Sequence, residues 1–338
     1  MTAPTGALPN WTFPMRKFFA PFIAAGLGAL ISLGATFSAS AAETQPLVSV
    51  SWLKEHLNDK HLLVLDIRSA IDGGGAKAYA EAHIPGAVHS DYDKAGWRVT
   101  RNDVPFMLPT VAELEKLIGD IGIDETTHVV VVPAGVSFTD FGSAARAYWT
   151  LKVVGVSNVS ILDGGVAAWK AAGLPLENGV KKPSPTIFTA TLNEKLLSRV
   201  EDVTKAETAK NVTLLDARPA SFFAGKEKAP NAKAYGHIPG AVNLDSASFY
   251  DAATNKLRPR AELVRFAAQI PAQGPVIAYC NTGHWAATDW FVLHELLGRQ
   301  DVSLYDGSMV EWTANATRPI DSSRTKWDDV KKALGLGS

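Results

Sequence analysis

The sequence predicts an α/β protein with two tandem units, each a mainly parallel sheet covered by helices on both faces. Short apolar runs rich in Val, Ile and Leu alternate with helical stretches, a pattern typical of parallel sheets with both faces buried. The same motifs also occur twice in the same order, which indicates an internal duplication. Ligands of such sheets bind beyond the carboxyl ends of the strands, so functional residues are expected there.

Residues 1–42 are expected to be a secretory signal peptide. Arg16 and Lys17 precede an apolar stretch over 18–37, and small residues around Ala42 offer a cleavage site. No twin arginine precedes the stretch, so export of the unfolded chain by general secretion is expected. The expected destination is a bacterial periplasm. Met15 begins the pattern and is a candidate for the true start. Retention of the stretch as a membrane anchor is the alternative; cleavage would leave no stable membrane association.

The repeat sets the domain boundaries. The segments at 62–68, 82–88, 129–132 and 161–165 recur at 213–218, 236–242, 276–279 and 304–308, at a spacing of about 150 residues. We therefore expect a first unit over 47–175, a linker over 176–198 and a second unit over 199–338.

Capping residues mark where helices begin. Thr110 and Glu113 form a capping pair for a helix over 111–118, and Ser198 with Glu201 is expected to cap the first helix of the second unit. The runs 129–132 and 276–279 are each expected to lead through a loop into a helix, over 144–154 and 286–297 respectively.

Cys280 is the only cysteine among 338 residues, and it opens the second of these loops. Converging backbone N–H groups and a helix N-terminus favour an anion, so this position suits a nucleophilic thiolate. The alternative is a small buried apolar side chain, the usual role of a lone cysteine.

Composition narrows the classes of target. A formal net charge of −1 gives no basic surface for nucleic acid or for an anionic membrane. The eight histidines are dispersed and no second cysteine is present, so no metal site, haem, other cofactor or internal disulfide is expected. The target is expected to be a small molecule or another protein.

Two copies of Asp-x-Arg, His-Ile-Pro-Gly-Ala and Asp-Gly-Gly/Ser, with a cysteine loop only in the second, resemble the tandem-domain rhodaneses. These are the thiosulfate and 3-mercaptopyruvate sulfurtransferases, and the resemblance covers about 47–320. It implies a catalytic second domain and a first domain without a nucleophile. The sequence agrees, because Pro133-Ala134-Gly135 stands where the second unit has Cys280.

The resemblance also implies a ping-pong reaction through a persulfide of Cys280. Sulfane sulfur passes from a small anionic donor to a thiophilic acceptor such as cyanide or a thiol, or to a protein. Thiosulfate is slightly favoured over 3-mercaptopyruvate, because a secreted protein is better placed to meet inorganic sulfur compounds than a cytosolic keto acid.

Substrate contacts are expected mainly from the loop after the cysteine. Thr282 offers a hydroxyl, and Gly283 permits backbone geometry that a side chain would obstruct. His284 could orient a donor, supply positive charge or form the loop wall, and Trp285 is expected to shape the pocket. Backbone N–H groups are expected to surround the sulfur along the whole loop, which comprises Asn281, Thr282, Gly283, His284, Trp285 and Ala286.

Arg218 is also a candidate for binding the donor, with an internal ion pair as the alternative. His83, His237, Asp66 and Asp216 occur in both units and are therefore expected to be structural.

The loop departs from the family. It contains neither the basic residues of the thiosulfate enzymes nor the Gly-Ser-Gly-Val-Thr pattern of the mercaptopyruvate enzymes. The family often adds an arginine four residues beyond that of Asp-x-Arg, and here Phe222 stands at that position.

Other classes of function share this type of fold. A phosphatase would need an arginine in the loop to bind phosphate oxygens, and the loop has none. A periplasmic sulfur carrier or partner-binding module with little turnover remains an alternative. A redox sensor is another, although no resolving cysteine is present.

Overall fold

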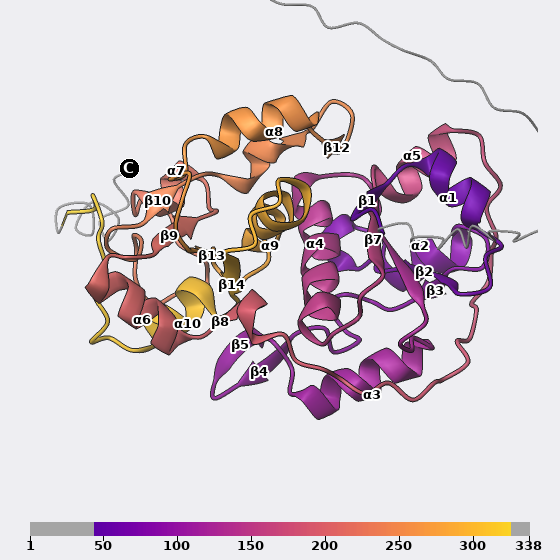
Figure 1. Cartoon of the computed structure of the whole chain (residues 1–338), viewed down its shortest axis with the longest axis horizontal. Coiled ribbons are helices and arrows are strands. Elements are labelled where there is room, and N and C mark those ends of the chain that lie inside the picture. Colours follow the sequence, from indigo (N-terminus) through magenta and orange to yellow (C-terminus); the bar gives the residue numbers. More distant parts are fainter. Residues whose placement is uncertain (1–43, 326–338) are drawn as a thin grey trace, which may run out of the picture. The chain divides into compact units, whose positions relative to one another are not determined.

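The computed structural model describes residues 44–325, which form two α/β domains, each built around a five-stranded sheet (Figure 1). The expected signal peptide lies outside the described residues. Within them, no helix is long and apolar enough to cross a membrane.

The two sheets repeat the same topology. The first runs in the order β1 (Leu47–Val48), β7 (Val159–Leu162), β6 (His128–Val132), β2 (Leu62–Asp66) and β3 (Val88–His89). The second runs in the order β8 (Leu197–Ser198), β14 (Val302–Tyr305), β13 (Val276–Tyr279), β9 (Thr213–Asp216) and β10 (Val242–Asn243). Every pairing in both sheets is parallel. The predicted fold class and the duplication are therefore confirmed.

Helices cover both faces of each sheet. Successive side chains of a strand point to opposite faces, and the buried strand residues here give each sheet two apolar faces to cover. In the first domain one face packs on α1 (Val50–His56), α2 (Gly75–Glu81) and α5 (Gly165–Ala171), and the other on α3 (Val111–Ile121) and α4 (Phe138–Val153). In the second, one face packs on α6 (Val200–Ala209) and α10 (Ser308–Ala314), and the other on α8 (Arg260–Ala267) and α9 (Ala286–Trp290). The short helix α7 (Ala220–Phe223) follows β9.

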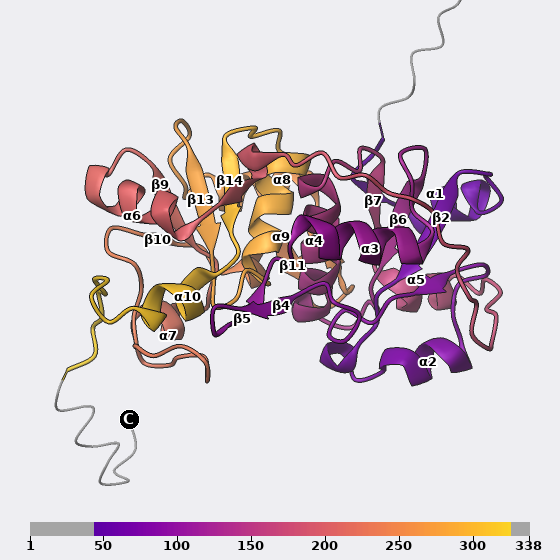
Figure 2. The ribbon, with the colours of Figure 1, turned by 90° about the horizontal axis from the view of Figure 1, so that it is seen from below.

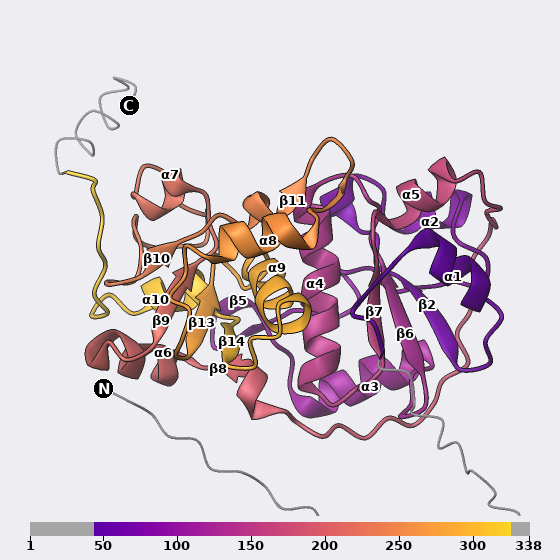
Figure 3. The same ribbon diagram turned by 45° about the horizontal axis from the view of Figure 1, so that its top comes forward.

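One apolar core is common to both domains. It contains buried residues of α3 and α4 together with buried residues of α8 and α9. Helices α4 and α9 lie side by side where the domains meet (Figure 1, Figure 3). A hairpin of β4 (Val99–Arg101) and β5 (Val104–Met107) leaves the first domain and contacts α10 of the second (Figure 2). A second hairpin consists of β11 (Tyr250–Asp251) and β12 (Lys256–Leu257).

Several element boundaries differ from those predicted. The capping pair of Thr110 and Glu113 is confirmed, but α3 continues to Ile121, where Gly122 adopts a left-handed conformation. Helix α4 begins at Phe138 rather than 144, because the Ser137 side chain caps it there by accepting the Asp140 N–H. The helix expected over 286–297 is α-helical only to Trp290 and continues as a π-helix over Phe291–Leu296.

The predicted cap at Ser198 and Glu201 is wrong by one residue. Arg199 is the N-cap, and its N–H donates to the Asp202 carboxylate at 3.0 Å. Ser198 belongs to the edge strand β8, and its hydroxyl instead hydrogen-bonds the Ser303 hydroxyl at 2.7 Å.

Candidate active site

Cys280 lies at the carboxyl end of β13, with only 1% of its surface exposed, and it lines a cavity of about 550 Å³. Four loop residues share the cavity wall: Asn281, Thr282, His284 and Trp285. The first domain contributes Ile71, Asp93, Arg98, Phe106 and Thr139, and Pro230 completes the lining. The thiol therefore faces a space between the two domains.

Ser308 anchors the cysteine loop through hydrogen bonds to its backbone. Its hydroxyl oxygen accepts the N–H groups of Cys280 and Gly283, each at 3.0 Å, and its proton is donated to the Tyr305 carbonyl at 2.8 Å. The Gly283 N–H is thus directed at Ser308, away from the expected ring of donors around the sulfur. Ser308 has φ 50°, and Gly165 at the equivalent position of the first domain has φ 56°. That glycine-to-serine difference between the copies, at a left-handed position, was the signal that could have identified Ser308 from sequence.

Arg146 reaches the same loop from α4 of the first domain. It is fully buried, with NH1 donating to the Thr282 carbonyl at 3.4 Å and NH2 lying 3.5 Å from the Asp306 carboxylate. Burial lowers the pKa of Arg146, and the negative charge of Asp306 opposes this effect. Asp306 also accepts the Leu108 N–H at 2.6 Å. A buried cation of the first domain therefore holds the backbone of the cysteine loop.

Gly283 leaves no room for a side chain beside Arg146. It has φ +68°, and a Cβ there would lie 2.2 Å from Arg146 NH1 and 2.8 Å from the Asp306 backbone. The expected need for glycine thus has a direct steric reason.

His284 makes hydrogen bonds to the first domain through both ring nitrogens. Nε2 lies 2.8 Å from the Thr139 carbonyl, which can only accept, so Nε2 carries the proton and Nδ1 accepts from the Tyr92 hydroxyl at 3.0 Å. Burial, followed by the positive charge of Arg98, lowers the pKa of His284 to about 3. The ring is therefore neutral, which favours the loop-wall interpretation over a source of positive charge.

Trp285 forms an aromatic wall beside the cysteine. Its ring centroid lies 5.9 Å from that of Phe138 and 6.1 Å from that of Phe222, and its Nε1 donates to the Thr139 hydroxyl at 3.3 Å. The position at which the family often has its second arginine is thus occupied by an apolar ring packed on the loop.

The remaining loop residues differ in how far they are buried. Thr282 is partly exposed, whereas Asn281 is 9% exposed and its buried Oδ1 has no partner among the described residues. Ala286 begins α9 and is fully buried, which leaves only its backbone as a potential contact.

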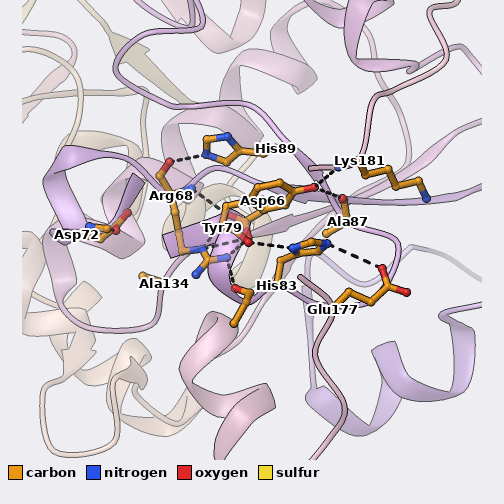
Figure 4. Close-up of polar contacts among 12 residues, drawn as sticks. Asp66, Arg68, Asp72, Tyr79, His83, Ala87, His89, Ala134, Glu177 and Lys181 are labelled. Atoms are coloured by element: carbon orange, nitrogen blue, oxygen red, sulfur yellow. Dashed lines mark hydrogen bonds and ion pairs between the residues drawn. The ribbon is translucent and has the colours of Figure 1, made fainter. Parts of the chain in front are cut away.

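Arg218 makes an internal ion pair and does not line the cavity. Its Nε and NH2 donate to the Asp216 carboxylate at 2.9 and 2.6 Å, and NH2 also donates to the Gly236 carbonyl. Arg68 makes the same pair with Asp66 in the first domain (Figure 4).

The repeated histidines make local backbone contacts, as expected of structural residues. His83 Nδ1 lies 2.9 Å from the Tyr79 carbonyl, with Nε2 3.8 Å from the Glu177 carboxylate (Figure 4). His237 Nδ1 lies 2.7 Å from the Phe223 carbonyl.

The first-domain counterpart of the cysteine loop already contains an anionic group. The Asp140 carboxylate accepts the N–H groups of Ala134, Gly135 and Val136 at 3.0, 2.6 and 3.1 Å. Burial raises the pKa of Asp140 to about 6, and these N–H groups oppose that rise. A cysteine in place of Pro133 would thus find neighbouring donors occupied by a carboxylate.

Over residues 44–325, no group of three His, Cys, Asp or Glu side chains could hold a metal ion.

Comparison with known proteins agrees with this geometry. The family described as "Rhodanese-like domain" matches residues 49–172 and 199–315. The chain belongs to the rhodanese-like family. The 3-mercaptopyruvate sulfurtransferase of Escherichia coli strain K12 is 32% identical over 279 residues, spanning 81% of this chain and 97% of that protein. The thiosulfate sulfurtransferase of Bos taurus is 34% identical over 281 residues, spanning 79% of this chain and 91% of that protein.

A solved structure of the rhodanese fold is similar as well. The crystal structure of the Escherichia coli 3-mercaptopyruvate enzyme SseA matches with a TM-score of 0.67 and 30% identity, spanning 78% of this chain and 99% of that one. This rhodanese-like protein is accordingly a sulfurtransferase, with sulfur donors and thiol acceptors as its general class of substrates.

Proposed function

We propose that Cys280 is the sole carrier of sulfur and that its persulfide is the intermediate between donor and acceptor. The observation that carries this proposal is the position of the only cysteine, at the carboxyl end of β13 and facing the cavity between the domains. No other thiol is available for covalent transfer.

The reaction is two displacements at sulfur. The Cys280 thiolate attacks the outer sulfur of thiosulfate, and a new S–S bond forms as the old one breaks. The electron pair of the broken bond leaves with sulfite. Cyanide or a thiolate then attacks the outer persulfide sulfur, which regenerates the Cys280 thiolate. Neither step requires a cofactor or an external oxidant.

We propose thiosulfate as the preferred donor, with 3-mercaptopyruvate as the second candidate. Relatives named for each activity have similar identity to this chain, so the preference rests on the expected export of the protein. Residues 1–42 have the order of charged, apolar and small residues typical of a secretory leader. We propose periplasmic residence after cleavage near Ala42. N-terminal sequencing of protein from the periplasmic fraction tests this, and membrane-bound protein that retains residues 16–37 would contradict it.

Mass spectrometry tests the carrier assignment. Exposure to thiosulfate, or separately to 3-mercaptopyruvate, should add one sulfur of about 32 mass units to the mature chain. The Cys280→Ser variant should gain none and should lose turnover. Full activity of that variant would refute the assignment. A persulfide that forms but turns over slowly with cyanide and small thiols would instead favour a sulfur carrier.

A further inference from the structure

We propose that Arg98, a residue of the first domain, binds the anionic group of the sulfur donor in the Cys280 cavity. This inference rests on the proposed persulfide function and specifies how the donor is held. It assigns donor recognition to the domain that has no nucleophile.

The surroundings of Arg98 hold its guanidinium in a fixed place. The guanidinium carbon lies 4.3 Å from the Tyr92 ring centroid and 4.9 Å from that of Phe106. Arginine stacks on aromatic faces in this way without losing the donors at its edge. The side chain is 8% exposed and Arg98 lines the cavity that contains Cys280.

The hydrogen-bonding capacity of Arg98 is incompletely used. NH2 donates to the Asp93 carboxylate at 2.9 Å, whereas the buried Nε has no partner among residues 44–325. Buried donors are nearly always satisfied, so this unused donor, on a residue that lines the cavity, is available to a group bound there. Asp93 keeps 25% of its side chain exposed, and water can therefore solvate its carboxylate when an anion approaches Arg98.

The other cationic groups near the cysteine are engaged elsewhere. Arg218 is paired with Asp216, and Arg146 contacts Thr282 and Asp306; neither lines the cavity. His284 is neutral, and the position of the second family arginine is Phe222. Arg98 is therefore the one arginine or lysine among the described residues of the cavity wall.

The chemistry of the ligand follows from this placement. Most other lining residues are apolar or neutral, so the site favours a small donor with one oxyanion group at Arg98 and its sulfur directed at Cys280. The sulfonate end of thiosulfate and the carboxylate of a mercapto keto acid share this chemistry. With thiosulfate, the displaced electron pair develops on the sulfite that Arg98 holds, so the guanidinium favours both binding and departure.

Steady-state kinetics of three variants test the proposal. Arg98→Ala should raise the KM for thiosulfate by at least about tenfold, since a charge-assisted contact is lost. Arg98→Lys should give an intermediate KM, because the charge remains without the planar fork. Asp93→Asn should lower the KM, because it removes a competing negative charge. Increasing salt should raise the KM of the wild type much more than that of Arg98→Ala.

The half-reactions separate binding from folding. Discharge of a preformed persulfide by cyanide should be nearly the same in Arg98→Ala and the wild type, since that step does not use the donor's oxyanion. An unchanged KM in Arg98→Ala, or a KM that rises equally in Asp93→Asn, would overturn the proposal; the second result would indicate that the ion pair only stabilises the fold. Failure of wild-type Cys280 to gain sulfur from either donor would instead refute the persulfide function. Repeating the series with 3-mercaptopyruvate distinguishes the two donors.

Discussion

Gly283 shows how closely the first domain packs on the cysteine loop. Because a Cβ would lie 2.2 Å from Arg146 NH1, Gly283→Ala must displace either the loop or the arginine. We expect most of the turnover to be lost, together with more stability than the 1–2 kcal/mol or so that left-handed backbone strain costs alone. Gly240→Ala is the matched control, since Gly240 has φ +77° but no atom within 4 Å of its Cβ position. Urea unfolding and thiosulfate kinetics of both variants measure the difference, and equal effects would show that the Arg146 contact is unimportant.

His284 should make stability depend on pH. Its pKa is about 3 in the folded chain, against an ordinary value of 6.5. The unfolded chain therefore binds a proton first as pH falls. The contribution of His284 to the free energy of unfolding therefore has its full value above about pH 6.5. Between that pH and about pH 3 it falls by up to about 1.4 kcal/mol per pH unit.

The variant His284→Gln tests this, because an amide can still accept from Tyr92 and donate to Thr139 but does not titrate. Between pH 7 and 5, in steps of about half a unit, its unfolding free energy should fall less than that of the wild type. The exposed His61→Gln variant serves as the control. An unchanged slope in His284→Gln would contradict the assignment of a buried neutral ring.

Sequence could identify Cys280 and the need for Gly283, because the loop between an apolar strand and a helix is visible in the chain itself. It could not identify Arg98 or Arg146 as parts of the same site. Both come from the first domain, more than a hundred residues away, and their approach depends on how the domains pack. The role of Arg218 depends on its distance to Asp216, which the sequence alone does not give.

At the level of elements, the start of α10 supports the cysteine loop. Ser308 occupies a left-handed position there and accepts two loop N–H groups. Ser308→Gly keeps the backbone conformation, as Gly165 does in the first domain, and removes only the hydroxyl. Ser308→Ala removes the hydroxyl and retains the strain.

We expect both variants to lose at least about tenfold in persulfide formation, because two buried N–H groups lose their acceptor. Ser308→Ala should also be less stable than Ser308→Gly by roughly 1 kcal/mol. Persulfide formation by mass spectrometry and thermal unfolding are the two measurements. Wild-type rates in Ser308→Gly would mean that the loop holds its shape without this anchor.

The hydrophobic pattern and the repeat were enough to predict which segments are helices and which are strands, but not where some of them begin and end. Ser198 and Glu201 have capping spacing, yet pairing of β8 with β14 draws Ser198 into the sheet. The π-helical turn after α9 has no recognisable sequence pattern, and it lies in the segment buried against the first domain. Tertiary packing overrides local preference at both places.

Across the whole described molecule, the two domains are joined by a common core rather than by a thin polar contact. Phe141 and Tyr148 of α4 pack against Phe291 at the end of α9, with ring centroids 5.9 and 5.0 Å apart. Polar contacts continue this surface to the active loop through Tyr92, Thr139 and Arg146. Each domain keeps an apolar cluster of its own on one face of its sheet, whereas the faces that carry α4 and α9 have merged into one core.

The second domain alone, residues 199–338, should therefore fold poorly and bind donor weakly. Without α4, the rings of α9 would face water, Asp306 would lose Arg146 and the Leu108 N–H, and the cavity would lose Arg98. We expect a lower unfolding midpoint, a broader transition and a KM for thiosulfate raised at least as much as in Arg98→Ala. Denaturant unfolding, dye binding to exposed apolar surface and kinetics measure these effects, with the full chain as reference.

If the fragment instead unfolded cooperatively and matched the full chain in KM, the first domain would contribute neither to the core nor to the site. Loss of stability with an unchanged KM would refute the role of Arg98 in donor binding.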